Sequence, residues 1–176
     1  RCQRLISGIE KSIPQDRANM IKSLLELYNQ NAKGAVALAH ENYKISNNLQ
    51  VLRNAAYVFQ RTMAVDCVVD VTEKIIRISK KQNLDYIKNM PPDYEVNYFL
   101  AGDLDIIDPN LHSQKSNLLF ESLKDIQGRL EISNTSLKAL VKVMHEAVLG
   151  VDAKFVVTQY SYINEEFLLT VFVKAS

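Results

Sequence analysis

Tryptophan is absent from this chain of 176 residues, which also contains only two cysteines, four prolines and five glycines. Two thiols as far apart as Cys2 and Cys67 do not form a disulfide framework, so we expect a reducing compartment such as the cytoplasm. No run of about 18 apolar residues occurs, which predicts no membrane span. With 21 basic and 20 acidic residues the formal net charge is +1, so no global field attracts nucleic acid or an anionic membrane.

The motifs of several enzyme classes are missing as well. Neither GxGxxG nor GxxxxGK occurs, and no serine lies in a GxSxG turn. His40 and His145 are each followed by glutamate, but Lys44 and Leu149 stand where a zinc protease has its second histidine. Cys67 has no base close to it in sequence, so we interpret it as a buried structural thiol. We therefore expect no metal and no cofactor, and we lean against an enzyme.

What the chain does contain is a core-forming share of apolar residues, 47% of the total. This share and the length predict a single domain over residues 1–176, with a helical part at 1–150. Apolar side chains recur at helical spacing in five to seven segments, which predicts a helical bundle. Because the chain opens on Arg1 instead of methionine, we expect it to be a piece of a longer protein. No repeat of fixed period is visible in the residue types.

Polar clusters divide these segments. Ser12-Ile13-Pro14-Gln15 predicts a helix start, and the cluster at 46–48 predicts a break. The cluster at 29–31 either ends the preceding helix or lets it run on to Ile45. The most continuous apolar pattern of the chain runs over 49–78, which we interpret as helix although its middle is rich in valine. Further helices are expected over 113–129 and from the capping run 133–136 to Gly150.

The period changes near the end of the chain. Residues 155–163 and 167–173 are rich in β-branched and aromatic residues and are separated by Asn-Glu-Glu, which predicts a β-hairpin over 154–174. A lone pair of strands is marginal in water, so the hairpin needs a cover. Apolar residues alternate over 94–100, and a third strand from this segment is one open alternative.

The stretch PPDYEVNYFLAGDLDIIDPN, residues 91–110, gathers acids, aromatics and prolines. Asp103, Asp105 and Asp108 resemble the opening of a calcium loop. The glycine at its sixth position and the glutamate at its twelfth are missing, however, and without them the loop neither turns nor completes its ligands. We interpret the stretch as a connector, because Pro91-Pro92 ends a helix and Asp108 precedes a proline.

The leading hypothesis is a non-enzymatic protein–protein interaction or assembly module that contacts a partner or a second copy through the hairpin and the helical surface. Its basis is an apparent surplus of apolar surface on the hairpin. The partner-binding residues that we predict are Tyr160, Tyr162, Phe172, Tyr94 and Tyr98. Nucleic acid is not an expected partner.

Two alternatives remain open. The chain is a helical sensor or carrier domain that holds a small apolar ligand between helices, with Phe59, Met63 and Met144 in the lining. Otherwise it is an enzyme assembled from dispersed residues such as His112, Asp105 and Glu146, which a sequence alone does not bring together.

Overall fold

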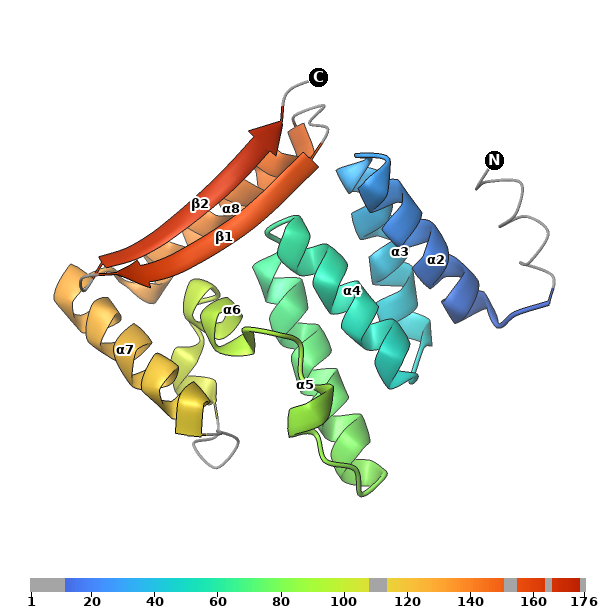
Figure 1. Ribbon diagram of the computed structural model, residues 1–176, viewed down its shortest axis with the longest axis horizontal. Coiled ribbons are helices and arrows are strands. Elements are labelled where there is room, and N and C mark those ends of the chain that lie inside the picture. The colour runs from blue at the N-terminus through green and yellow to red at the C-terminus, as the bar shows by residue number, and fades with distance from the viewer. Residues whose placement is uncertain (1–11, 108–113, 151–154, 164–165, 175–176) are drawn as a thin grey trace.

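The computed structural model describes residues 12–107, 114–150, 155–163 and 166–174. In this part of the chain there are seven α-helices, two short 3₁₀ helices and two strands (Figure 1). The elements in chain order are α2 (Gln15–Tyr28), α3 (Ala32–Ile45), α4 (Leu49–Arg61), α5 (Val65–Lys81), η1 (Ile87–Asn89), α6 (Tyr94–Leu100), η2 (Leu104–Ile106), α7 (Gln114–Leu130), α8 (Asn134–Gly150), β1 (Phe155–Ile163) and β2 (Glu166–Lys174).

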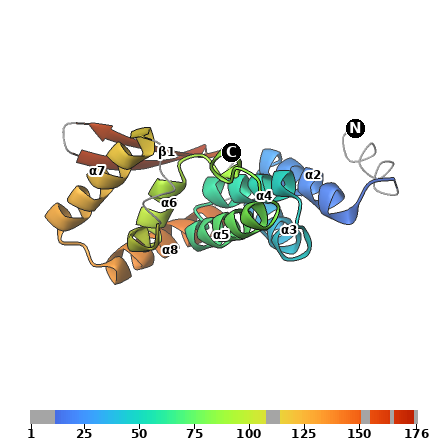
Figure 2. The same cartoon turned by 90° about the horizontal axis from the view of Figure 1, so that it is seen from below.

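Helices α2 to α5 form two antiparallel hairpins that stack side by side. Figure 2 shows that they make two layers, with α2 and α4 in one layer and α3 and α5 in the other. Helices α6, α7 and α8 continue the molecule beyond α5 (Figure 1). The buried apolar residues form two clusters, one around Phe59 between α3, α4 and α5, and one around Leu104 and Leu123 between α5, α6, α7 and α8.

The two helical hairpins are a structural repeat with an offset of 33 residues. Every residue that the structure buries in α2 and α3 has a buried counterpart 33 positions later, in α4 and α5. The pairs are Ala18 and Val51, Asn19 and Leu52, Ser23 and Ala56, Ala35 and Val68, Ala39 and Thr72, and Asn42 and Ile75. The prediction that the chain has no repeat is therefore wrong for this part of it.

One difference between the repeats explains an unpaired hydroxyl. Ser46 and Ser79 are equivalent and both are buried. The Ser46 hydroxyl donates to Asp16 Oδ2 at 2.6 Å. The residue equivalent to Asp16 in the second repeat is Leu49, which accepts no hydrogen bond through its side chain. Ser79 Oγ is accordingly the only buried side-chain oxygen or nitrogen without a hydrogen-bond partner in the described part of the chain.

We predict opposite effects for the same substitution at the two serines. Ser46→Ala is expected to lower the free energy of unfolding by about 1–2 kcal/mol, because it removes a hydrogen bond to a carboxylate. Ser79→Ala is expected to leave it unchanged or to raise it by about 1 kcal/mol, because it removes a buried polar atom that lacks a partner. Urea unfolding followed by circular dichroism measures both. Equal losses at the two positions would contradict the assignment of the repeat.

The long helix predicted from the most continuous apolar pattern is wrong, because the chain turns between α4 and α5. Met63 adopts a left-handed conformation with φ 59°. The N–H of Met63 bonds to Gln60 O at 3.2 Å, and the N–H of Ala64 bonds to Phe59 O at 2.9 Å. These two bonds form a Schellman motif, which usually ends a helix at glycine. Gln30, the equivalent residue at the end of α2, has φ 73°.

Other predicted boundaries are confirmed. The side chain of Asn48 accepts hydrogen bonds from the N–H groups of Gln50 and Val51, at 3.0 and 3.2 Å, and so caps α4. Ser133 Oγ accepts from the N–H of Ser136 at 3.1 Å and caps α8, which ends at Gly150 as expected.

The predicted third strand at 94–100 is wrong, because this segment is helix α6. All seven of its residues are buried, including Glu95 and Asn97 between the apolar positions. The alternation of apolar residues is therefore not the signature of a strand with one covered face. When a segment is buried on all sides, the spacing of its apolar residues does not show whether it is a helix or a strand.

The predicted fold class also needs correction where it includes a C-terminal β-hairpin. Over residues 12–107 and 120–150 the protein is helical and contains no strand. A β-hairpin packed into this helical body is therefore not supported. Strands β1 and β2 run antiparallel, with Phe155 opposite Lys174 and Ile163 opposite Glu166. Almost all of their side chains lie outside the described residues.

Candidate functional site

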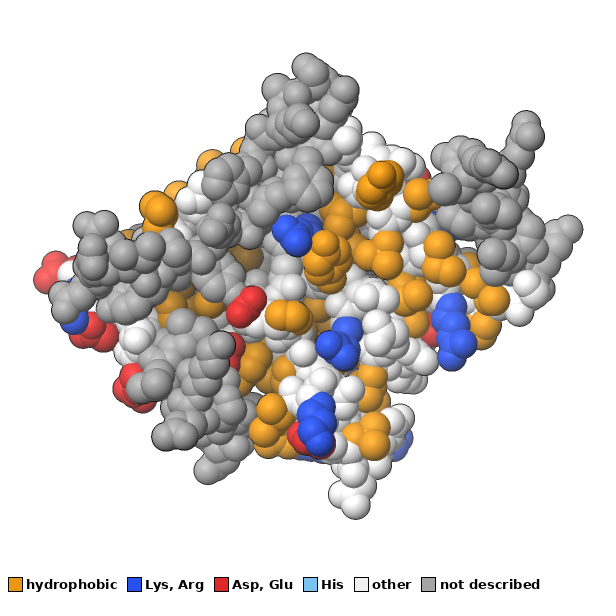
Figure 3. Space-filling view, in the orientation of Figure 1, with side chains coloured by type: hydrophobic (Ala, Val, Ile, Leu, Met, Phe, Trp, Pro, Cys, Tyr) orange, Lys and Arg blue, Asp and Glu red, His pale blue; other side chains and the backbone are white. Residues whose placement is uncertain are grey.

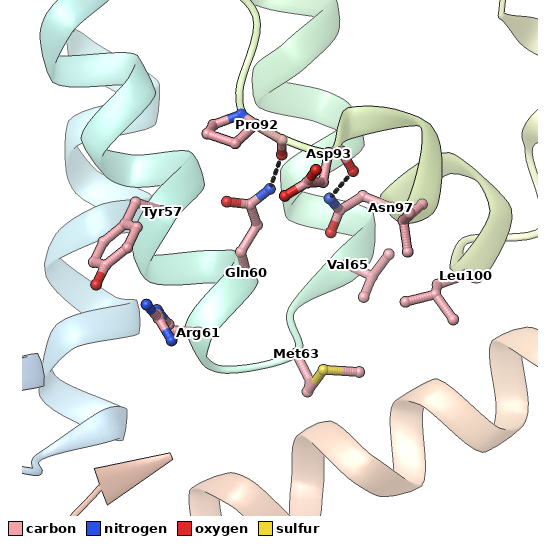
Figure 4. Close-up of a pocket in the computed structure, with 10 residues that line it drawn as sticks. Tyr57, Gln60, Arg61, Met63, Val65, Pro92, Asp93, Asn97 and Leu100 are labelled. Carbon is pink, nitrogen blue, oxygen red and sulfur yellow. Dashed lines mark hydrogen bonds between the residues drawn. The ribbon is translucent and has the colours of Figure 1, made fainter. Parts of the chain in front are cut away.

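Among the described residues lies a pocket of about 290 Å³, which we call the α4–α6 pocket (Figure 4). It lies between the C-terminal half of α4, the start of α5, and the turn that leads into α6. Its lining consists of Tyr57, Gln60, Arg61, Met63, Val65, Pro92, Asp93, Val96, Asn97 and Leu100. Usual pockets for drug-sized ligands measure about 300–1,000 Å³, so this one suits a group no larger than a side chain or a small metabolite.

Two local backbone features shape the pocket. Met63, in the Schellman turn after α4, places its buried side chain in the lining. Pro91-Pro92 prevents the preceding segment from continuing as helix, and Asp93 follows with a left-handed φ of 54° before α6 begins. Two of the five non-glycine residues with positive φ in the described chain thus line one pocket. Such residues concentrate at functional sites more often than elsewhere.

Two amide side chains hold the turn in place. Gln60 Nε2 donates to the carbonyl oxygen of Pro92 at 2.7 Å, and Asn97 Nδ2 donates to the carbonyl oxygen of Asp93 at 2.9 Å. The first bond ties the turn to α4 across 32 positions of the sequence, and the second ties it to α6. The backbone of the turn is therefore fixed from both sides, as Figure 4 shows.

Charged groups stand on two sides of the pocket. The guanidinium of Arg61 lies over the ring of Tyr57, with Cζ 5.1 Å from the ring centroid. Figure 4 shows this pair at the left and Asp93 near the top, with Val65 and Leu100 at the right and Met63 at the bottom. Neither Arg61 nor Asp93 forms an ion pair with any residue that the structure describes. The pocket thus combines an apolar floor with a cationic and an anionic edge.

A cysteine and a histidine that are distant in sequence meet beside this region. Cys67 Sγ on α5 lies 3.5 Å from His40 Nε2 on α3. Burial raises the pKa of the Cys67 thiol to about 11, and the nearby carboxylates of Asp70 and Asp66 act in the same direction. Burial and the charge of Lys44 lower the pKa of His40. At neutral pH the contact therefore joins a neutral thiol to a neutral imidazole, which does not supply a nucleophilic thiolate.

Cys67 also lines a smaller pocket of about 110 Å³, together with His145 and Lys142 of α8. The ring of His145 contacts the carbonyl oxygen of Thr62 through Nδ1, at 2.5 Å. In the part of the chain that the structure describes, no three His, Cys, Asp or Glu side chains are placed to hold a metal ion together. Metal chemistry at this pocket has no ligand set among these residues.

Tyr94 and Tyr98, which we predicted to contact a partner, lie inside the helical body. Their side chains are 7% and 2% exposed, and their rings pack against each other at a centroid distance of 6.4 Å. The Tyr98 hydroxyl donates to Glu73 Oε1 at 2.5 Å. Burial and this hydrogen bond raise the pKa of Tyr98. Both tyrosines are core residues and offer no free surface to another protein.

The remaining predicted residues divide into three groups. The side chains of Tyr160, Tyr162 and Phe172, and the whole of His112, lie outside the described residues. Met63 lines the α4–α6 pocket. Phe59 is fully buried in the core beneath His40, and Met144 is half-buried against the other apolar cluster, so neither lines that pocket.

The acidic residues that resembled a calcium loop have lysine partners instead. Asp103 Oδ1 pairs with Lys138 Nζ at 3.0 Å, and Asp105 Oδ1 pairs with Lys124 Nζ at 3.4 Å. These pairs tie the segment after α6 to α8 and α7. Asp108 lies outside the described residues.

No known protein family, curated protein or solved structure matched this chain. Among the described helices, none has both the length and the apolar character that crossing a membrane requires. The class that the fold itself defines is a helical domain built from stacked helical hairpins.

Proposed function

We propose that this chain is a non-enzymatic binding module that holds a small, mostly apolar group in the α4–α6 pocket. The group belongs to a small ligand or to a side chain of a partner protein. The observation that carries the proposal is the composition of this pocket, in which an apolar floor of Met63, Val65, Val96 and Leu100 meets only a few polar groups. Ligand sites in proteins typically have this composition.

The architecture around the pocket supports a binding role. Stacked helical hairpins form extended surfaces that repeat proteins use for recognition. Figure 3 shows apolar side chains, interrupted by lysine and arginine, on the face of the molecule that α2 and α4 form. The pocket opens where α6 follows the second hairpin, so a ligand there touches both the repeat and the segment packed onto it. The turn at Pro92 and Asp93 is already fixed by Gln60 and Asn97, which lowers the entropy cost of binding.

The chemistry of the other candidate centre argues against a thiol enzyme. Because burial raises the pKa of Cys67 and lowers that of His40, this pair lacks the thiolate that nucleophilic catalysis requires. The proposal therefore keeps the non-enzymatic role expected from the sequence and moves its site from the hairpin and the tyrosines to the α4–α6 pocket.

The proposal is tested by titrating hexanol, an apolar probe of suitable size, into the isotope-labelled protein. We expect backbone amide shifts to concentrate on α4 and α6. Tyr57→Ala should weaken binding about fivefold, because it removes an aromatic wall of the pocket. Tyr28→Ala is the matched control, because Tyr28 is 81% exposed and lies outside the lining. Shifts that map elsewhere, or equal losses in the two variants, would refute the proposal.

A further inference from the structure

The lining of the α4–α6 pocket contains hydrogen-bond acceptors without donors to match them. Gln60 and Asn97 each use their amide nitrogen to donate to a backbone carbonyl, at 2.7 and 2.9 Å. A carbonyl oxygen only accepts hydrogen bonds, so these contacts fix which end of each amide is nitrogen. The amide oxygens therefore point away from the two carbonyls, as Figure 4 shows. No hydrogen bond from a described residue reaches either oxygen.

The third acceptor is the carboxylate of Asp93. Its side chain is exposed at the edge of the pocket and has no ion-pair partner among the described residues. Arg61, the one cation in the lining, lies over Tyr57 on the opposite side. The acceptor set of Asp93, Gln60 and Asn97 thus carries one negative charge that the described chain leaves unneutralised.

We propose that the α4–α6 pocket binds a primary ammonium group carried on an unbranched apolar stem. This inference rests on the proposed function and names the chemistry of its ligand. An ammonium has three N–H donors, which match the three acceptors, whereas a guanidinium presents five donors in a rigid planar fork. The stem lies along the apolar floor, and the charged head stays beside the exposed carboxylate. Either a free alkylamine or a lysine side chain of a partner protein has this chemistry.

The test compares three probes of equal length, hexylammonium, hexanol and hexanoate, titrated at neutral pH and followed by amide shifts in α4 and α6. We expect hexylammonium to bind about tenfold more tightly than hexanol, because its hydrogen bonds are charge-assisted. A lysine capped at both ends forms a fourth arm. If it binds like hexylammonium, a partner's lysine is a sufficient ligand, and if only the free amine binds, the ligand is a small molecule.

A substitution at Asp93 tests whether its carboxylate causes the preference for hexylammonium over hexanol. Asp93→Asn keeps the size of the side chain, and asparagine tolerates the left-handed backbone, so we expect a folded protein. Its preference for hexylammonium over hexanol should fall to about equality. Asp105→Asn is the control, because Asp105 is exposed and lies outside the pocket lining.

Three other outcomes would contradict the ammonium inference, and one of them would also contradict the proposed function. If hexanol binds in the pocket as tightly as hexylammonium, the ammonium inference fails and the binding function stands. If hexanoate binds best, Arg61 is the anchor and the inference is wrong. If no probe shifts the amides of α4 and α6, the inference and the proposed function both fail.

Discussion

Phe59→Ala is expected to lower the free energy of unfolding by about 3–5 kcal/mol, the usual cost of emptying a phenylalanine site in a closed core. The Phe59 side chain is fully buried, and its ring centroid lies 5.0 Å from that of His40. Because α3, α4 and α5 all contribute to this cluster, the cavity left by alanine cannot collapse without moving a helix. Guanidinium or urea unfolding measures the loss directly.

Tyr57→Ala is the matched control for this prediction, because Tyr57 lies on the same helix two positions earlier and is 41% exposed. The guanidinium of Arg61 lies over its ring, and such exposed pairs contribute about 0.5–1 kcal/mol. We expect Tyr57→Ala to cost about 1 kcal/mol or less. If Phe59→Ala costs no more than the control, the space around Phe59 is loosely packed, as the hypothesis of a ligand held there requires.

Features that depend on local chemistry were predictable from the sequence. Asn48 and Ser133 accept hydrogen bonds from N–H groups two or three residues later, so the residue type and its position are sufficient to place a helix start. The break before α3 was one of two open alternatives, because the polar residues at 29–31 precede a run of strong helix formers. The helices themselves follow from apolar spacing, which depends only on residues within one or two turns.

Two features were not predictable because the deciding contacts are not local. The left-handed turn at Met63 carries no glycine signal, and the buried side chain there is retained by the surrounding core. Helix α6 was misread because Glu95 and Asn97, which looked like the exposed face of a strand, are buried by other helices. In both places tertiary burial overrides the local pattern.

The repeat escaped detection because burial repeats and residue identity does not. Ala39 corresponds to Thr72, and Asn42 corresponds to Ile75. In the first hairpin Asn42, with its amide oriented by its partners, donates to Asp16 O at 3.1 Å and accepts from the Met20 N–H at 2.9 Å. In the second hairpin an isoleucine fills the same place. Hydrogen bonds hold the helices together at this position in the first hairpin, and an apolar contact does so in the second. A comparison of residue types therefore does not detect the repeat.

In the candidate site, too, local features were predictable from the sequence and contacts between distant residues were not. The stretch that contains Pro92, Asp93 and Asn97 attracted notice in the sequence for its acids, aromatics and prolines. Nothing in the sequence indicated that Gln60 binds the carbonyl oxygen of Pro92, because that contact joins residues 32 positions apart. The aromatic residues of the stretch suggested a docking surface, yet they are the part that the core covers, and the polar residues beside them line the pocket.

Cys67 is expected to react with iodoacetamide about a hundredfold more slowly at pH 8 in the folded protein than in the unfolded chain. The thiolate is the reacting form, and burial raises the pKa of this thiol from its ordinary value of 9.0 to about 11. Because the thiolate fraction below the pKa falls tenfold for each unit by which the pKa rises, the folded protein holds about a hundredfold less thiolate. A Cys2→Ser variant leaves Cys67 as the single thiol of the chain, so mass spectrometry follows one reaction.

The pH dependence separates this electrostatic effect from simple shielding. A raised pKa means that the thiol stays protonated until the pH approaches about 11, so the labelling rate should increase tenfold per pH unit up to that value. Shielding alone slows the reaction equally at every pH. His40→Gln, which keeps a polar side chain beside the sulfur, should leave the profile in place, because the neutral imidazole does not stabilise a thiolate. A profile that levels off near neutral pH and moves upward in His40→Gln would instead show a thiolate–imidazolium pair, and with it a nucleophile that a binding module does not need.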